Sequence, residues 1–222
     1  MANTITVWSD VGCPWASLFV WRALARRAAL GLEEAVRLDH RCFPLELVNE
    51  RPTPRAVVDA EVEALAPLVP DAGWRAWSRD PSAYPVTTLP ALEAVQAAKA
   101  QGLDASERLD LALRQAFWRD NRCISLRHEV LAAAESAGVD VAALAEALDA
   151  GTARQAVVDD WRAFKEAGVQ GSPHVFLPDG SDVANPGIEQ HWEGPKPGGK
   201  PVVDSDDVGA IDALLRRAAE AS

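Results

Sequence analysis

Cysteine is scarce in this sequence. Cys13, Cys42 and Cys123 are its only three cysteines, and so small and odd a number does not build a disulfide scaffold. The chain also lacks the basic start and apolar stretch of a secretory signal before its first predicted strand. We therefore expect a cytoplasmic protein whose thiols stay reduced unless they carry out chemistry.

Long apolar runs, an excess of basic residues and common ligand motifs are absent as well. No apolar run approaches the ~20 residues that cross a bilayer. The 22 Lys and Arg residues are outnumbered by 33 Asp and Glu residues, which gives a net charge of −11. Nucleic acids and anionic membranes bind basic surfaces, so neither is an expected partner. The cysteines and four histidines never approach metal-ligand spacing, and no dinucleotide-binding or P-loop motif occurs, so no metal is expected.

The residues that are present predict a β-α-β unit at the start of the chain. Residues 4–9 are rich in β-branched and aromatic side chains, which is typical of a strand. Residues 14–29 carry apolar side chains three and four apart, which predicts a helix. Residues 35–42 alternate strictly and predict a second strand. One face of this strand is expected to carry Val36, Leu38, His40 and Cys42.

The middle of the chain is predicted to be helical. From residue 55 to residue 167 almost every stretch shows the apolar spacing of a helix. Thr88, Ser106 and Asp140 each stand where they could cap such a helix.

Strands return towards the C-terminal end. Residues 174–177 and 181–184 predict a hairpin around an Asp-Gly turn. Residues 185–201 are rich in glycine and proline and predict a loop. A last amphipathic helix is expected to start at Asp204 or Ser205.

This order of elements predicts an α/β chain with a thioredoxin-like fold and an inserted all-helical domain. Without the helical block, the order is β-α-β followed by α-β-β-α, which is the thioredoxin topology. We expect residues 1–54 and 151–222 to form the thioredoxin-like domain and residues 55–150 to form the insertion.

Cys13 is the first candidate for a catalytic residue. It lies between the first strand and the first helix, in Cys13-Pro14-Trp15-Ala16. A helix start offers unpaired N–H groups and a positive dipole end, which can stabilise a thiolate, and Pro14 suits the first turn. Ala16 stands where a redox pair would place its second cysteine. The alternative is that Cys13 is a small buried residue with no chemical role.

Several segments resemble one known family. The segment from Trp8 to Trp15, Phe43-Pro44-Leu45-Glu46-Leu47 and the segment from Gly171 to Phe176 resemble the DsbA-like thioredoxin-fold proteins of the FrnE type. The segment from Ala116 to Ser125 is similar to part of their helical insertion. The same superfamily contains 2-hydroxychromene-2-carboxylate isomerases and kappa-class glutathione transferases, which place a serine where Cys13 stands.

The resemblance implies a thiol-dependent oxidoreductase or thiol transferase that acts through Cys13, with Pro14 beside it. No tightly bound cofactor is expected. The second thiol would come from glutathione or another low-molecular-weight thiol, or from Cys42 or Cys123. The substrate would be a small thiol or disulfide. Two alternatives stay open: a glutathione-dependent isomerase or transferase for small aromatic or electrophilic substrates, and a non-catalytic relative that binds a ligand or partner.

The expected substrate-binding residues lie next to Cys13 or in the segments that the resemblance brings near it. They are Trp15, Ser172, Pro173, His174, His191 and Trp192. The resemblance implies a cis bond before Pro173 that lies against Cys13. Asp10, three residues before the thiol, could hold a proton or cap the helix. The oligomeric state is left open, a homodimer included.

Overall fold

The predicted β-α-β start is confirmed by the computed structural model, which describes residues 2–221. Strand β1 (Asn3–Ser9), helix α1 (Pro14–Ala29) and strand β2 (Val36–Cys42) follow one another. The two strands pair in parallel along their whole length. Every second residue of β2 is buried, as the strict alternation predicts.

The central sheet has the strand order β2-β1-β3-β4. Strand β3 (His174–Phe176) runs antiparallel to β1, and β4 (Asp182–Ala184) runs antiparallel to β3, so the predicted hairpin is confirmed. Gly180 in the turn has a φ of 85°, a conformation that glycine adopts easily. Because β3 pairs with β1, the chain just before β3 lies beside the end of β1.

Helices fill most of the chain between β2 and β3, as predicted. They are α2 (Leu45–Val48), α3 (Arg55–Leu65), α4 (Leu89–Ala98), α5 (Leu103–Trp118), α6 (Arg127–Ser136), α7 (Val141–Ala150) and α8 (Arg154–Ala163).

The three expected caps of these helices behave differently. Asp140 caps α7 by accepting a hydrogen bond from the Ala143 N–H at 3.0 Å, as predicted. Thr88 precedes α4 but makes no side-chain cap bond. The prediction for Ser106 is wrong, because α5 starts directly after Gly102 and Ser106 lies inside it.

The segment 185–201 is not a loop, so this prediction is wrong. Strand β5 (Ile188–Glu193) and strand β6 (Lys200–Asp206) form a separate antiparallel hairpin. Five of the eight glycines and prolines of this segment lie in residues 194–199, where they make the turn of this hairpin. The glycine and proline content of the turn therefore led to a loop prediction for the strands on both sides of it.

The last helix, α9 (Val208–Glu220), is capped by Asp207, whose carboxylate accepts a hydrogen bond from the Ala210 N–H. The expected caps Asp204 and Ser205 are wrong because both residues lie in β6.

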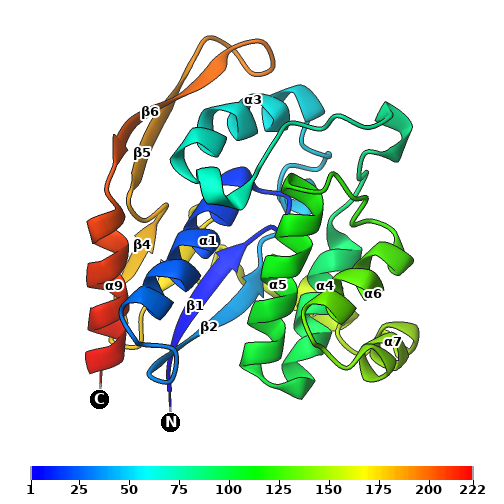
Figure 1. Ribbon diagram of the computed structural model, residues 1–222, viewed down its shortest axis with the longest axis vertical. Helices are drawn as coiled ribbons and strands as arrows, with labels where there is room; N and C mark the ends of the chain where they lie inside the picture. The colour runs from blue at the N-terminus through cyan, green and yellow to red at the C-terminus, as the bar shows by residue number, and fades with distance from the viewer. Residues whose placement is uncertain (1, 222) are drawn as a thin grey trace.

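Helices α1 and α9 pack together over one face of the sheet (Figure 1). Helices α4 to α7 gather on the side of β2 away from α9, and the β5–β6 hairpin reaches up to α3 (Figure 1). The largest apolar cluster joins Leu18 and Cys42 to Leu109 and Val130. The expected boundaries of the helical insertion stay a prediction. None of the helices in the described part of the chain is both long and apolar enough to cross a membrane.

Candidate active site

Cys13 lies at the start of α1, directly before Pro14. Its Sγ donates a hydrogen bond to the carbonyl oxygen of Ser172 at 3.2 Å. The Ser172-Pro173 bond is cis. The expectation that this turn lies against Cys13 is therefore confirmed. The pairing of β3 with β1 explains the contact, because it carries the residues before His174 to the end of β1.

A cleft of about 400 Å³ opens beside the Cys13 thiol. Its volume lies in the range of small-molecule sites. The start of α1, the segment 49–54, helix α3, Ser172 and the β5–β6 hairpin form its walls. Cys13 itself is 5% exposed, so a substrate has to enter the cleft to meet the sulfur.

The surroundings of Cys13 oppose its ionisation. Burial, and then the negative charge of Glu61, raise the pKa of the Cys13 thiol to about 11. Both effects oppose the thiolate that the helix start is expected to favour, and the catalytic role of Cys13 stays a prediction.

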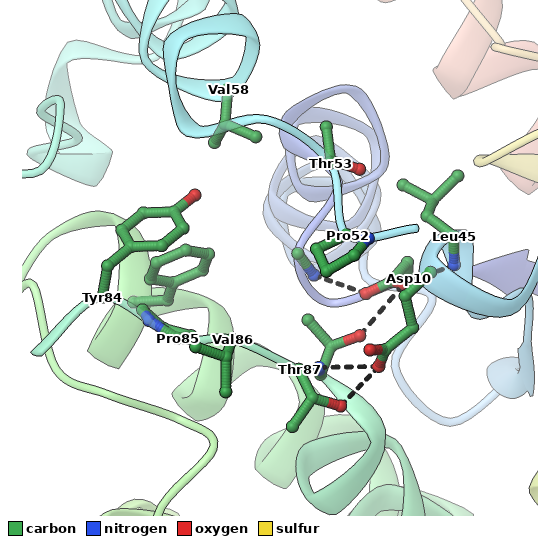
Figure 2. Close-up of a pocket in the computed structure, with 13 residues that line it drawn as sticks. Asp10, Leu45, Pro52, Thr53, Val58, Tyr84, Pro85, Val86 and Thr87 are labelled. Carbon is green, nitrogen blue, oxygen red and sulfur yellow. Dashed lines mark hydrogen bonds between the residues drawn. The ribbon is translucent and has the colours of Figure 1, made fainter. Parts of the chain in front are cut away.

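Asp10 is a structural anchor beside the thiol. Its carboxylate accepts hydrogen bonds from the Gly12 N–H at 2.8 Å, the Leu45 N–H at 2.8 Å and the Thr88 hydroxyl at 3.1 Å (Figure 2). Burial raises the pKa of Asp10. In the described part of the chain, this carboxylate makes no hydrogen bond to the thiol and does not cap α1. It joins the loop before α1 to α2 and to the start of α4.

The Asp10 anchor also borders a second, small pocket of about 50 Å³. Tyr84, Pro85 and Val86 line its far side (Figure 2). The segment from Pro52 to Thr53 lines both this pocket and the cleft.

Arg114 holds the backbone on both sides of Cys13, a role that the sequence analysis missed. Arg114 is 1% exposed and lies on α5. It donates two hydrogen bonds to the Asp110 carboxylate, and one each to the Ser9 hydroxyl, the Asp10 carbonyl and the Ser17 hydroxyl. All five donors of the guanidinium are therefore used.

Ser17 links Arg114 to Cys13 through hydrogen bonds. Its hydroxyl donates to the Cys13 carbonyl at 3.0 Å and accepts from the Trp118 indole at 2.8 Å. Helix α5 thus fixes the chain on both sides of Cys13. The spacing of Asp110 and Arg114 on a buried helix face could have signalled an ion pair, but not its target.

Three of the predicted site residues reach the cleft beside Cys13. Pro14, Trp15 and Ser172 line it. The buried Trp15 indole N–H interacts with the Glu61 carboxylate and opposes the rise in its pKa, although it meets no acceptor at standard hydrogen-bond geometry among residues 2–221. Pro173 is buried next to Ser172 and is not part of the lining.

His174 is a core residue and does not reach the cleft, contrary to its expected role. It is 0% exposed. Its Nδ1 accepts a hydrogen bond from the Gln170 N–H, so its Nε2 donates to the Asp182 carboxylate at 2.8 Å. Strand β3 places this side chain in the core, where both ring nitrogens are satisfied.

His191 and Trp192 lie in β5 and not in a loop, and neither lines the cleft. His191 Nδ1 lies 2.8 Å from the Asp204 carboxylate across the hairpin. Trp192 supports Lys196, whose Nζ lies 4.2 Å from the centre of a Trp192 ring. The hairpin residues that do line the cleft are Gln190, Lys196 and Pro197.

The other two cysteines lie outside the cleft lining. Within the described part of the chain all three cysteines are free. Cys42 is 0% exposed and belongs to the apolar core. Cys123 is 9% exposed between α5 and α6. A role for either as the second thiol stays a prediction.

The geometry of a thiol at a helix start beside a cis-proline turn agrees with comparisons to known proteins. The profile of the DSBA-like thioredoxin domain matches residues 4–192. The chain therefore belongs to the DSBA-like thioredoxin family. A search of curated protein sequences finds no match.

Solved structures support the same fold. A probable DsbA oxidoreductase from Streptomyces coelicolor is similar at 20% identity and a TM-score of 0.70, over 97% of this chain and 89% of that one. The cytosolic disulfide reductase DsbM from Pseudomonas aeruginosa is similar at 16% identity and a TM-score of 0.64, over 97% and 95%. A 2-hydroxychromene-2-carboxylate isomerase is similar at 16% identity and a TM-score of 0.55, over 81% and 87%.

Proposed function

We propose that this protein is a thiol oxidoreductase or thiol transferase that acts through Cys13 alone, with glutathione or a similar small thiol as the second thiol. The observation that carries the proposal is the position of the Cys13 sulfur in a cleft of about 400 Å³, against the Ser172 carbonyl. Ala16 occupies the place of a resolving cysteine, and no other cysteine lines this cleft among the described residues.

The reaction follows ordinary thiol–disulfide exchange. The Cys13 thiolate attacks the glutathione sulfur of a mixed disulfide, a new Cys13–glutathione disulfide forms, and the substrate leaves as a thiolate that takes up a proton. A second glutathione thiolate then attacks the glutathione sulfur bound to Cys13. This step releases glutathione disulfide and returns the Cys13 thiolate. Overall, the mixed disulfide and one free glutathione give the substrate thiol and one molecule of glutathione disulfide.

The relatives support a reducing setting for this reaction. DsbM is described as a cytosolic disulfide reductase, and one of its structures contains glutathione. We therefore place this protein in the cytoplasm, where a small thiol is available to reset Cys13.

The test is a reaction with glutathione disulfide, read by mass spectrometry of each cysteine. We expect one glutathione adduct on Cys13, and Cys42→Ser and Cys123→Ser variants that form the same adduct. Reduction of a glutathionylated peptide should be lost in Cys13→Ala. Full activity of Cys13→Ala, or an adduct on another cysteine alone, would contradict the proposal.

A second function is favoured by one observation, the raised pKa of Cys13. A protonated thiol can donate a hydrogen bond to the sulfur of bound glutathione, as a serine hydroxyl would. The protein would then be a glutathione-dependent isomerase or transferase for small aromatic or electrophilic substrates. Activity that survives in Cys13→Ser, with glutathione bound noncovalently, would favour this function over the first.

A further inference from the structure

A buried carboxylate faces the same cleft as the Cys13 thiol. Glu61 lies on α3, is 7% exposed and lines the cleft. Burial raises the pKa of this carboxyl above its ordinary value. A carboxylate removed from water needs a cation or several hydrogen-bond donors close to it.

The side chains around Glu61 provide only part of the compensating charge and hydrogen bonding. The Lys196 Nζ lies 3.8 Å from Glu61 Oε1, beyond hydrogen-bond distance, and the Lys196 side chain is 48% exposed. The Lys196 ammonium is shared with the Trp192 ring. At this distance, and with the Lys196 ammonium open to solvent, the pair compensates only part of the Glu61 charge.

The charged groups around the two side chains come from every wall of the cleft. Glu61 on α3 and Asp10 before α1 both act on Cys13 with negative charge. Lys196 in the hairpin turn and the Trp15 indole on α1 act on Glu61. The thiol therefore faces two carboxylates, and Lys196 is paired with one of them at long range. Arg51 in the segment 49–54 is a second cation that lines the cleft, and its side chain is exposed.

A second acceptor in the cleft is also without a partner. The amide oxygen of Gln190, on β5, is buried and accepts no hydrogen bond from the described residues. An ammonium group carries three donors and a positive charge. The Glu61 carboxylate and the Gln190 amide oxygen are thus two acceptors in the cleft to which an ammonium group could donate.

We propose that Glu61 binds the ammonium group of an amino-acid-containing thiol, and that this contact promotes loss of the Cys13 proton. The proposal rests on the proposed function for the identity of the thiol. When the ammonium binds, it neutralises the carboxylate that opposes ionisation of Cys13. The proton leaves to solvent, and the electron pair stays on the sulfur as the nucleophile. Cys13 is then reactive when the small thiol is bound and unreactive when it is not.

The inference also names the substrate class. Small thiols with an α-ammonium group, such as glutathione, should be used, and uncharged thiols of similar size should be used poorly. This discrimination is set by Glu61 and not by Cys13.

The first test is calorimetric binding of S-methylglutathione, which cannot react with Cys13. Glu61→Gln should raise its dissociation constant about tenfold to a hundredfold, the loss typical of a charge-assisted contact. Glu63→Gln is the matched control, because Glu63 is exposed on the same helix, and it should leave binding unchanged. S-methylglutathione without its amino group should bind weakly, and equally to both the parent protein and Glu61→Gln.

The second test is a pH titration of the Cys13 thiolate by its ultraviolet absorbance. In the parent protein S-methylglutathione should lower the titration midpoint. In Glu61→Gln the midpoint should already be lower without ligand, and the ligand should not lower it further. At a pH below both midpoints, alkylation of unliganded Cys13 should be about tenfold faster in Glu61→Gln.

The outcomes separate this inference from the proposed function. Equal binding and equal midpoints in the parent protein and Glu61→Gln would overturn the inference and leave the reaction at Cys13 intact. No binding of S-methylglutathione to the parent protein would overturn it too. Full activity of Cys13→Ala would overturn the proposed function, while the midpoint difference at Glu61 would persist. Unchanged circular dichroism shows that Glu61→Gln is folded.

Discussion

At the residue scale, Cys13 combines two opposing influences. The start of α1 favours a negative charge, whereas burial and the nearby Glu61 disfavour it, and the pKa of about 11 shows that the second influence is larger. The sequence predicts the first influence, because Pro14 marks the helix start. It does not predict the second, because α3 and the hairpin enclose the thiol only in the folded protein.

This balance predicts the pH dependence of Cys13 reactivity. The thiolate fraction rises tenfold per pH unit below the pKa, so the alkylation rate by iodoacetamide should still be rising above pH ~9. A short unstructured peptide with one cysteine, measured in parallel, should level off earlier, because its thiol has an ordinary pKa of about 8.5. A rate for Cys13 that levels off near neutral pH would contradict the prediction.

At the element scale, α5 acts on the thiol through Arg114. All five N–H groups of this side chain donate hydrogen bonds, either to Asp110 or to residues on both sides of Cys13. The helix therefore supports the site without lining the cleft.

Loss of this side chain should lower stability strongly. Arg114→Met leaves the Asp110 charge buried without its partner, which should reduce the free energy of unfolding by about 3–5 kcal/mol in urea. The exposed pair of Arg108 and Asp104 lies on the same helix with the same spacing. Arg108→Met should therefore cost less than about 1 kcal/mol.

The double variant completes this comparison. Asp110→Leu with Arg114→Met removes both buried charges, so it should cost less than Arg114→Met alone. Equal losses in Arg114→Met and Arg108→Met would contradict the role of the buried pair.

The elements also show what the sequence can predict. The β-α-β start was predictable because alternation in residues 35–42 and helical spacing in residues 14–29 stand side by side. The β5–β6 hairpin was not, because glycine and proline in residues 194–199 dominate the local composition. Of the site, the thiol and the Ser172-Pro173 turn were predictable from motifs.

Glu61 and Arg114 were not predictable from sequence. Each lies on an amphipathic helix among apolar residues, and each gains its role from segments far away in the chain. Helical spacing shows that such a residue faces inward, but it does not show which other segment it meets.

At the scale of the whole molecule, one apolar cluster joins the thioredoxin-like part to the helices between β2 and β3. It contains Trp15 from the first part and Trp74, Trp77 and Trp118 from the second. A shared core of this kind favours joint unfolding.

We therefore expect a single unfolding transition. Tryptophan fluorescence and far-ultraviolet circular dichroism should give the same midpoint in urea. In a variant with Trp74, Trp77 and Trp118 replaced by phenylalanine, the fluorescence comes from residues 1–54 and 151–222 alone. Its unfolding curve should also coincide with the circular dichroism of the variant. Two separate midpoints would instead show that residues 55–150 unfold independently.

The β5–β6 hairpin has a consequence for how such a protein can diversify. Its strands pair only with each other, and its base is joined by the bond from the Asp207 N–H to the Gly187 carbonyl at 2.8 Å. It nevertheless supplies Gln190, Lys196 and Pro197 to the cleft. The outer wall of the cleft is thus an arm outside the central sheet, held to the rest of the protein by Ile188 in the core and by the pair of Arg22 and Asp206. Mutation or exchange of this arm can change which molecules reach the sulfur while the central sheet keeps its pairing.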